Sequence, residues 1–560
     1  MNDANSKEVS EPGSPNSSHR EKQRGIWWVM KWGLVFFFLL VVALVFLNFR
    51  TGPGVDSPLV RVSAGTTYVT SPLKPNGDPD YVAFLNQQRA VTPDNNALVD
   101  LLRIMGPMSE PANKSPEFYK LLGMEPLSEK GDYLEHISLS ASRGNPAIDI
   151  SATVDGVLLD EMQVFEVTLS YPFAKGDFPA VDQWFARNEH HLLAIRQAVK
   201  KPGFYFPFVG GSLVYGYLSI TEFRELVRSL CRSSMVRLGR GDVTGAIDDQ
   251  IAILRLDRHL GNQGSITGLL VGTSIVEMGN GMIAITLFSG KCTADDLARM
   301  AAEIDSLPNL PVVNNVHLET ERVYALDLAF TFGRAGQQGE FDQATRATIN
   351  DRLWIASIDW EIALQTLNGF YDSLERDLGL ASMQQRVAAF DNFEQALKDL
   401  ESGNSSIQSK IRSTMAGRAA RGKRTGEWLA VQTLPSMSLF VKSDRKNIAQ
   451  NLVTRAAVAV EQYRMEHGEY PKTLNALVPE FLAEVPVDPY SGKQLVYRPD
   501  PVRLFRLYSI GPNEKDDDGI GYLEAKDSDY DLPAVPKILS IDEWLEASGL
   551  APGKEPPKEN

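Results

Sequence analysis

The chain has 560 residues, of which 43% are hydrophobic and 23% are charged, and its net charge is -15. The hydrophobic content excludes a chain that is disordered throughout, and the acidic balance argues against a nucleic-acid-binding surface. The length predicts about three domains. Cys231 and Cys292, its only cysteines, form no ligand-spaced zinc motif, and the sequence leaves open whether they pair.

The N-terminal region predicts a membrane anchor. Residues 1–24 are rich in Ser, Asn, Pro and charge, so we expect a disordered tail. The 22 residues 26–47 are apolar apart from Lys31 and would extend about 33 Å as a helix, enough to cross a bilayer. We therefore predict a transmembrane helix over residues 25–48 that contacts membrane lipid through 26–47. A cleaved signal peptide is disfavoured, because the apolar segment is long and no small-x-small cleavage site follows Leu47.

The distribution of basic residues predicts the orientation of this helix. Lys and Arg residues precede the span or lie at its start, whereas only Arg50 follows it closely. The tail is therefore expected in the cytoplasm, and the bulk of the chain on the far side of the inner (cytoplasmic) membrane, as in a single-pass protein. Gly, Pro, Ser and Thr are frequent in residues 49–80, which predicts a tether.

A mixed α/β region is predicted over residues 81–210. A helix is expected from Pro93, and a small β region near 133–171, where apolar and polar residues alternate between turn signals. A second helix carries the adjacent pair His190 and His191, which suggests a metal site. Neighbouring helical residues point about 100° apart, however, and neither histidine has a His or carboxylate four residues later. We therefore expect structural or surface histidines.

Residues 211–402 have the pattern of an α-helical domain, with apolar residues at helical spacing and glycines between the segments. The segment from Ile266 to Phe288 is apolar enough for a second membrane span. Glu277 and Asn280 would be costly in lipid, so a buried helix of the domain is favoured.

Two further stretches of the body invite a functional interpretation. The segment from His317 to Glu321 has the composition of a metalloprotease helix, but it lacks a second histidine four residues after the first, so zinc chemistry is not expected. Residues 403–434 begin with Gly, Ser and Asn, and six basic residues follow over 410–424. The simplest interpretation is a solvated linker, and the alternative is a basic patch that docks on acidic membrane lipids.

The most specific pattern lies near the C-terminus. Apolar residues recur at helical spacing from Leu452 to Tyr463, and Gly468 ends the helix because glycine adopts the left-handed cap without a Cβ clash. A short helix and a proline-rich turn follow, and then two β-like runs over 494–498 and 503–510. One long helix therefore leads into a small sheet.

The landmarks of this region are a helix exit, a turn and a strand end: Tyr463, His467-Gly468, Tyr470-Pro471, Pro486, Asp488-Pro489, Gly492, Tyr497 and Leu507-Tyr508-Ser509-Ile510-Gly511. Their order over residues 451–519 resembles the C-terminal domain of the major pseudopilin of type II secretion systems. The resemblance implies a pseudopilin-like α+β domain, expected over 435–537, with a tail over 538–560. The leader and membrane helix of that family do not precede Asn451, so we do not expect a conventional pseudopilin subunit.

In that family the loop after the Tyr-Ser-x-Gly strand folds around a calcium ion. The resemblance therefore implies a Ca²⁺ site in residues 512–519, with Asn513, Asp516, Asp517 and Asp518 as candidate metal ligands. Asn513 occupies the place of an aspartate in the family. Three adjacent carboxylates repel one another, and a hard cation with oxygen ligands relieves that repulsion. The alternative is a solvated acidic turn without an ion.

No sequence motif assigns a catalytic or cofactor-binding residue. The chain has no Gly-x-Ser-x-Gly elbow, phosphate-binding loop or dinucleotide fingerprint. The leading hypothesis is a membrane-anchored extracytoplasmic binding or scaffolding protein, associated with a type II secretion or pilus-like envelope system through unknown envelope partners and without a nucleic-acid partner. The alternative is a membrane-anchored hydrolase with a site in the helical body.

Overall fold

The computed structural model describes residues 57–137, 152–154, 157–210, 213, 220–338, 357–405, 417–434, 437–500, 504–521 and 531–534. The predicted N-terminal tail, the transmembrane helix and the C-terminal tail lie outside these residues. The described chain is predominantly α-helical, as the sequence predicts.

The helices follow one another along the chain with few strands between them. The first are α2 (Tyr81–Arg89), α3 (Ala97–Met105), α4 (Pro116–Leu121), α5 (Glu161–Ser170) and α6 (Pro179–Ala198), with 3-10 turns at Pro93–Asn95 and Pro111–Lys114. The central ones are α7 (Ile220–Gly239), α8 (Val243–Asn262), α9 (Ile266–Phe288), α10 (Ala294–Asp305) and α11 (Asn315–Gln338). The last are α13 (Trp360–Leu378), α14 (Met383–Ser405), α16 (Arg418–Thr433) and α17 (Met437–His467), followed by a 3-10 turn at Leu474–Leu477.

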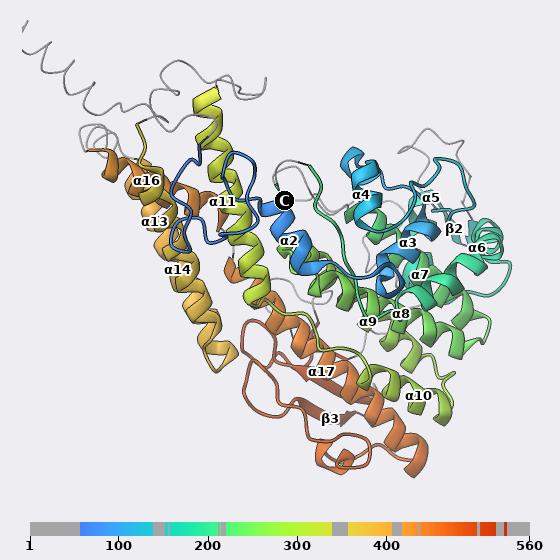
Figure 1. Cartoon of the computed structure of the whole chain (residues 1–560). Coiled ribbons are helices and arrows are strands. Elements are labelled where there is room, and N and C mark those ends of the chain that lie inside the picture. Colours follow the sequence, from blue (N-terminus) through green and yellow to red (C-terminus); the bar gives the residue numbers. More distant parts are fainter. Residues whose placement is uncertain are drawn as a thin grey trace, which may run out of the picture.

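Two hydrophobic cores organise these elements. The first core lies among α3 to α10 and extends into the C-terminal sheet. The second core lies among α2, α11, α13, α14 and α16. Figure 1 shows the corresponding two groups of helices side by side, with the orange helix α17 crossing beneath them.

Helix α17 contributes side chains to both cores. Met437 and Val441 near its start belong to the second core, whereas Val453 and Val460 further along belong to the first. The helix packs against α9, α10 and α14. The boundary predicted at residue 435 therefore separates elements that pack together, and the C-terminal unit shares its interior with the helical body.

A three-stranded antiparallel sheet follows α17. Its order is β3 (Val496–Asp500), β4 (Leu504–Ser509) and β5 (Leu532–Pro533), with Val496 paired to Tyr508 and Tyr508 paired to Pro533. Phe505 and Leu507 of β4 are buried in the first core. Gly468 ends α17 with a φ of 76°, the left-handed conformation expected from the sequence. The helix exit and the two strands thus form where the pattern predicts them.

The β region predicted near 133–171 falls in part outside the described residues. The described strands there are β1 (Ala152–Val154) and β2 (Val157–Leu159), which form an antiparallel pair. The end of the predicted β region is instead helix α5, capped by Asp160 and Gln163 in a reciprocal capping box. Phe165 and Val167 alternate as in a strand, but Val164 is buried as well. Burial on several sides of the helix therefore produced the misleading alternation.

The predicted tether is partly a packed segment. Leu59 and Val69 are buried in the second core. Asp78 accepts hydrogen bonds from Nε and Nη2 of Arg334 in α11, each at 2.7 Å, and from the backbone N–H of Leu59 at 2.8 Å. Within the expected tether, residues from 57 onward are therefore held against the body.

The predicted linker also contains a packed helix, α16, which lies against α13. Two glycines on α16 face the backbone of α13 and of the residue before it. A Cβ on Gly422 would lie 2.4 Å from the carbonyl oxygen of Asp359, and one on Gly426 would lie 2.4 Å from that of Ala363. The glycines thus permit a close approach of the two chain segments, where the sequence suggested a loose connection.

Among the described residues one helix, α9, is long and apolar enough to cross a membrane, and 61% of its most apolar window is buried inside the protein. It packs against α7, α8 and α17, which agrees with the predicted buried helix of the body. Lys446 of α17 forms an ion pair with Glu277. Cys231 and Cys292 are both free thiols, so the two cysteines are not paired.

Candidate functional site

The loop after β4 is fastened to the preceding turn by one buried carboxylate. Asp488 accepts a 2.7 Å hydrogen bond from the hydroxyl of Ser509 and a 3.2 Å bond from the backbone N–H of Ile510. It also accepts the N–H of Tyr490 at 3.0 Å. The Asp-Pro-Tyr turn and the strand end, which the sequence places 21 positions apart, therefore form one unit.

The structure divides the four candidate calcium ligands into two pairs. Asp516 and Asp518 face arginines: Arg498 lies 3.0 Å from the first carboxylate and 2.9 Å from the second, and Arg506 also pairs with Asp518. Asn513 instead donates to Asp517 Oδ2 at 2.7 Å. The carboxylates of the first pair are thus neutralised by cations of the protein, whereas that of Asp517 accepts a hydrogen bond from an uncharged amide.

Asp531 joins the second pair, and sequence reasoning did not single it out. Its side chain is fully buried, and Oδ2 accepts the backbone N–H groups of Asp517 at 3.1 Å and Gly519 at 2.7 Å. Oδ1 has no hydrogen-bond partner among the described residues. Burial, and then the charges of Asp517 and Asp516, raise the pKa of Asp531 to about 6.

Asn513, Asp517 and Asp531 are connected by hydrogen bonds, and their side chains carry one amide oxygen and two carboxylates. Such hard oxygen ligands are those that Ca²⁺ prefers. A buried carboxylate oxygen without a partner is costly, and a bound cation would satisfy it. Asp516 and Asp518 already have cationic partners and need no ion.

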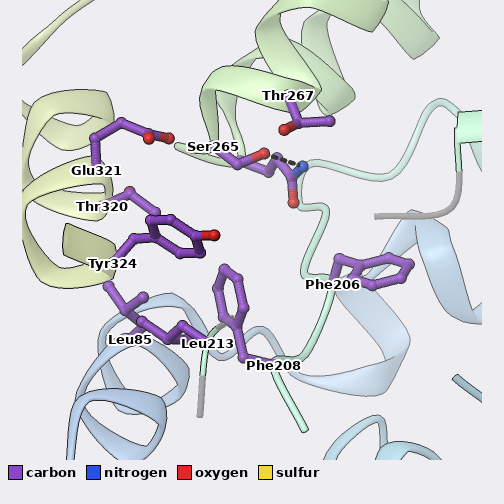
Figure 2. A pocket seen from close by; sticks show the side chains of 10 residues that line it. Leu85, Phe206, Phe208, Leu213, Ser265, Thr267, Thr320, Glu321 and Tyr324 are labelled. Atoms are coloured by element: carbon purple, nitrogen blue, oxygen red, sulfur yellow. Dashed lines mark hydrogen bonds between the residues drawn. The ribbon is translucent and has the colours of Figure 1, made fainter. Parts of the chain in front are cut away.

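A pocket of ≈ 160 Å³ lies where α2, α11, the start of α9 and the segment after α6 meet. Its lining residues are Leu85, Phe206, Phe208, Leu213, Gln263, Ser265, Thr267, Thr320, Glu321 and Tyr324. Figure 2 shows Glu321 and Tyr324 projecting from α11 on one side, with Phe208 below Tyr324, Ser265 and Thr267 above, and Phe206 on the far side. Gln263 donates to the hydroxyl of Ser265 at 2.8 Å. The pocket therefore combines an apolar wall with several polar groups.

Glu321 is the ionisable group of this pocket. Burial raises the pKa of its carboxyl to about 7, although the backbone N–H of Ile266 and the charge of Arg89 act in the opposite direction. Burial likewise lowers the pKa of Arg89 to about 10, opposed by Glu319 and Glu321. A carboxyl group that titrates near neutrality can accept or donate a proton at physiological pH.

His317, four residues before Glu321, has a structural role. Its Nε2 lies 2.8 Å from the carbonyl oxygen of Gly261, and its Nδ1 lies 3.0 Å from Asn314 Oδ1. Burial lowers the pKa of this imidazole. The histidine therefore connects the end of α8 to the start of α11.

No known protein family, curated protein or solved structure matches this chain. Two residues of interest, Asp531 and Glu321, carried no motif. Asp531 follows a run of acidic residues in which no position is distinguished by spacing. Glu321 belongs to a stretch whose composition suggested only zinc chemistry. Because Glu321 lies four residues after His317, the two side chains lie on the same face of the helix, and this spacing was the one signal in the sequence for a polar site there.

Proposed function

We propose that the chain is a membrane-anchored extracytoplasmic binding or scaffolding protein whose C-terminal α+β unit is stabilised by calcium, and that it works beside a type II secretion or pilus-like envelope system. One observation carries the proposal. The long helix α17 leads into an antiparallel sheet whose acidic loop closes on the buried carboxylate of Asp531. This element order and loop position are those that the resemblance to major pseudopilins implies.

In this proposal calcium neutralises the half-buried carboxylate of Asp517 and the buried carboxylate of Asp531, and it fixes the loop. Asn513, Asp517 and Asp531 hold the ion, while Glu514 of the same loop forms a 2.8 Å ion pair with Arg445 of α17. Arg445 also lies over the ring of Tyr490, 4.3 Å from its centroid. A fixed loop would thus present a constant surface next to α17, which is what a scaffold requires.

Topology and partner contacts test this function together. A reporter fused after Asn560 should be active only outside the cytoplasm, and cross-linking in intact envelopes should capture a secretion or pilus component in calcium but not in chelator. Asp531→Asn should lose the calcium-dependent cross-link, whereas Asp518→Asn should keep it. Reporter activity in the cytoplasm, or cross-links that ignore both calcium and Asp531, would refute the proposal.

The pocket around Glu321 favours a second candidate, a hydrolase with its site in the helical body. Glu321 would act as general base toward a water molecule, with Tyr324 and the nearby hydroxyls orienting a small substrate. The purified chain should then hydrolyse a member of a panel of small esters, amides and glycosides, and Glu321→Gln should abolish that activity. Activity that survives in Glu321→Gln would exclude this site.

A further inference from the structure

Two adjacent histidines of α6 converge on one carboxylate. His190 Nε2 lies 3.3 Å from Asp132 Oδ2, and His191 Nε2 lies 3.3 Å from Asp132 Oδ1. The two imidazole centroids are 3.8 Å apart, and the three ligand atoms lie within 4.8 Å of one another. The sequence predicted that these neighbours point apart, whereas in the structure both rings contact the same carboxylate.

The loop that carries Asp132 is held on α6 by buried partners. The backbone N–H of Glu135 donates to Asn188 Oδ1 at 2.8 Å, and the indole of Trp184 donates to the carbonyl oxygen of Glu135 at 2.6 Å. Trp184 and Asn188 are themselves buried. Asp132 is therefore positioned over the histidines by the fold, since its loop is anchored three residues away.

We propose that Asp132, His190 and His191 bind a divalent transition-metal ion of the zinc class. Two atoms that each lie about 2.0–2.1 Å from a tetrahedral zinc ion are about 3.3 Å apart. Each histidine nitrogen lies at this separation from one oxygen of Asp132, His190 Nε2 from Oδ2 and His191 Nε2 from Oδ1, and both separations exceed the roughly 2.7–2.9 Å of a charge-assisted hydrogen bond. The three side chains thus offer ligand atoms within reach of one ion.

The ligand types decide which ion suits the site. Imidazole nitrogens with one carboxylate select zinc, cobalt, nickel or copper over calcium, which distinguishes this site from the loop at Asp531.

Three protein ligands leave a fourth position open. Asp132 is 84% exposed and His190 is 58% exposed, so the ion faces solvent and its fourth ligand is water. Zinc sites with three protein ligands and a water are those in which the ion can polarise a bound molecule, whereas structural sites use four protein ligands.

Cobalt serves as the probe for this site. The untagged full-length chain in a neutral detergent, stripped of metal by chelator, should develop the visible absorption of four-coordinate Co²⁺ with one equivalent of the ion. Zinc should displace the cobalt, and excess calcium should not. Absence of both the cobalt absorption and any heat of zinc binding would overturn the proposal.

Variants assign the ion to these residues. His190→Gln and Asp132→Asn change exposed side chains, so their metal-free melting temperatures should match that of the unmodified chain, and their metal affinity should fall at least about tenfold. His467→Gln, an exposed histidine at the end of α17, is the matched control and should bind normally. Unchanged affinity in both site variants would refute the assignment. If His190→Gln fails to fold, Asp132→Asn alone decides.

Discussion

The backbone N–H of Gly519 donates a 2.7 Å hydrogen bond to Oδ2 of Asp531. The end of the acidic loop is therefore held by a buried carboxylate that lies 12 positions later in the chain. The other oxygen of this carboxylate has no partner among the described residues. The stability of the loop therefore depends on how the charge of Asp531 is compensated.

Calcium is expected to raise the melting temperature of the full-length chain by a few degrees relative to chelator. Binding to the folded state alone contributes about 2.7 kcal/mol at a hundredfold excess over the dissociation constant. Asp531→Asn and Asp517→Ala should abolish the shift, whereas Asp518→Asn should retain it, because Asp518 pairs with Arg498 and Arg506. Thermal unfolding in both conditions measures this. Coincident curves for the unmodified chain would exclude calcium.

In chelator the same carboxylate should make stability depend on pH. The folded-state pKa of Asp531 is raised from 3.8 to about 6, so between these values the folded state binds more protons than the unfolded state. Its contribution to the free energy of unfolding is therefore fully present below about pH 4 and is lost as the pH rises through 6. Denaturant titrations at several pH values should show that Asp531→Asn removes this part of the dependence of the unfolding free energy on pH. An identical slope in the variant would contradict the assignment.

Glu321→Gln should stabilise the chain at pH 8. Because burial raises the pKa of Glu321 from 4.5 to about 7, the folded state opposes ionisation of this carboxyl. Glutamine keeps an acceptor oxygen for the N–H of Ile266 but carries no charge. We expect a gain of roughly 1–3 kcal/mol at pH 8 that disappears near pH 4.5. Urea unfolding at the two pH values tests the sign, and a gain of equal size at both would point to packing instead.

Two glycine-to-alanine substitutions form a matched pair on α16 and α13. Gly426→Ala places a methyl group 2.4 Å from the carbonyl oxygen of Ala363 and should cost about 1–3 kcal/mol. Gly369→Ala meets no atom within 4 Å on an exposed face of α13 and should add about 0.5–1 kcal/mol through helix propensity. Chemical denaturation of both variants distinguishes a packed α16 from a loose linker, for which the two changes would have similar effects.

The sequence predicted correctly those helix ends and strands that depend on interactions between residues close together in the chain. Gly468 takes the left-handed conformation that ends α17. Strand β4 lies within its predicted run, and β3 overlaps its run but begins and ends two residues later. Each of these depends on residues a few positions apart, so the sequence contains the whole signal.

Contacts between distant residues decide what the sequence could not show. Asp132 and His190 are 58 positions apart, and only the fold of the intervening segment brings them together. Helix α5 is buried on several sides, so its apolar pattern does not distinguish a helix from a strand. Helix α16 is packed because its glycines lie against the backbone of α13. The run of basic residues in this segment does not reveal that contact.

The 31 residues of α17 form a rod about 46 Å long, whose first turns pack in the second core and whose middle turns pack in the first core. Close-packed interiors are nearly incompressible, so a tilt of the rod cannot be absorbed at one end alone. A displacement of the C-terminal sheet would therefore also displace the start of α17 and the helix α14 that packs against α17. For the same reason, cutting the chain before Met437 would expose hydrophobic surface on both fragments, and neither fragment would fold stably alone.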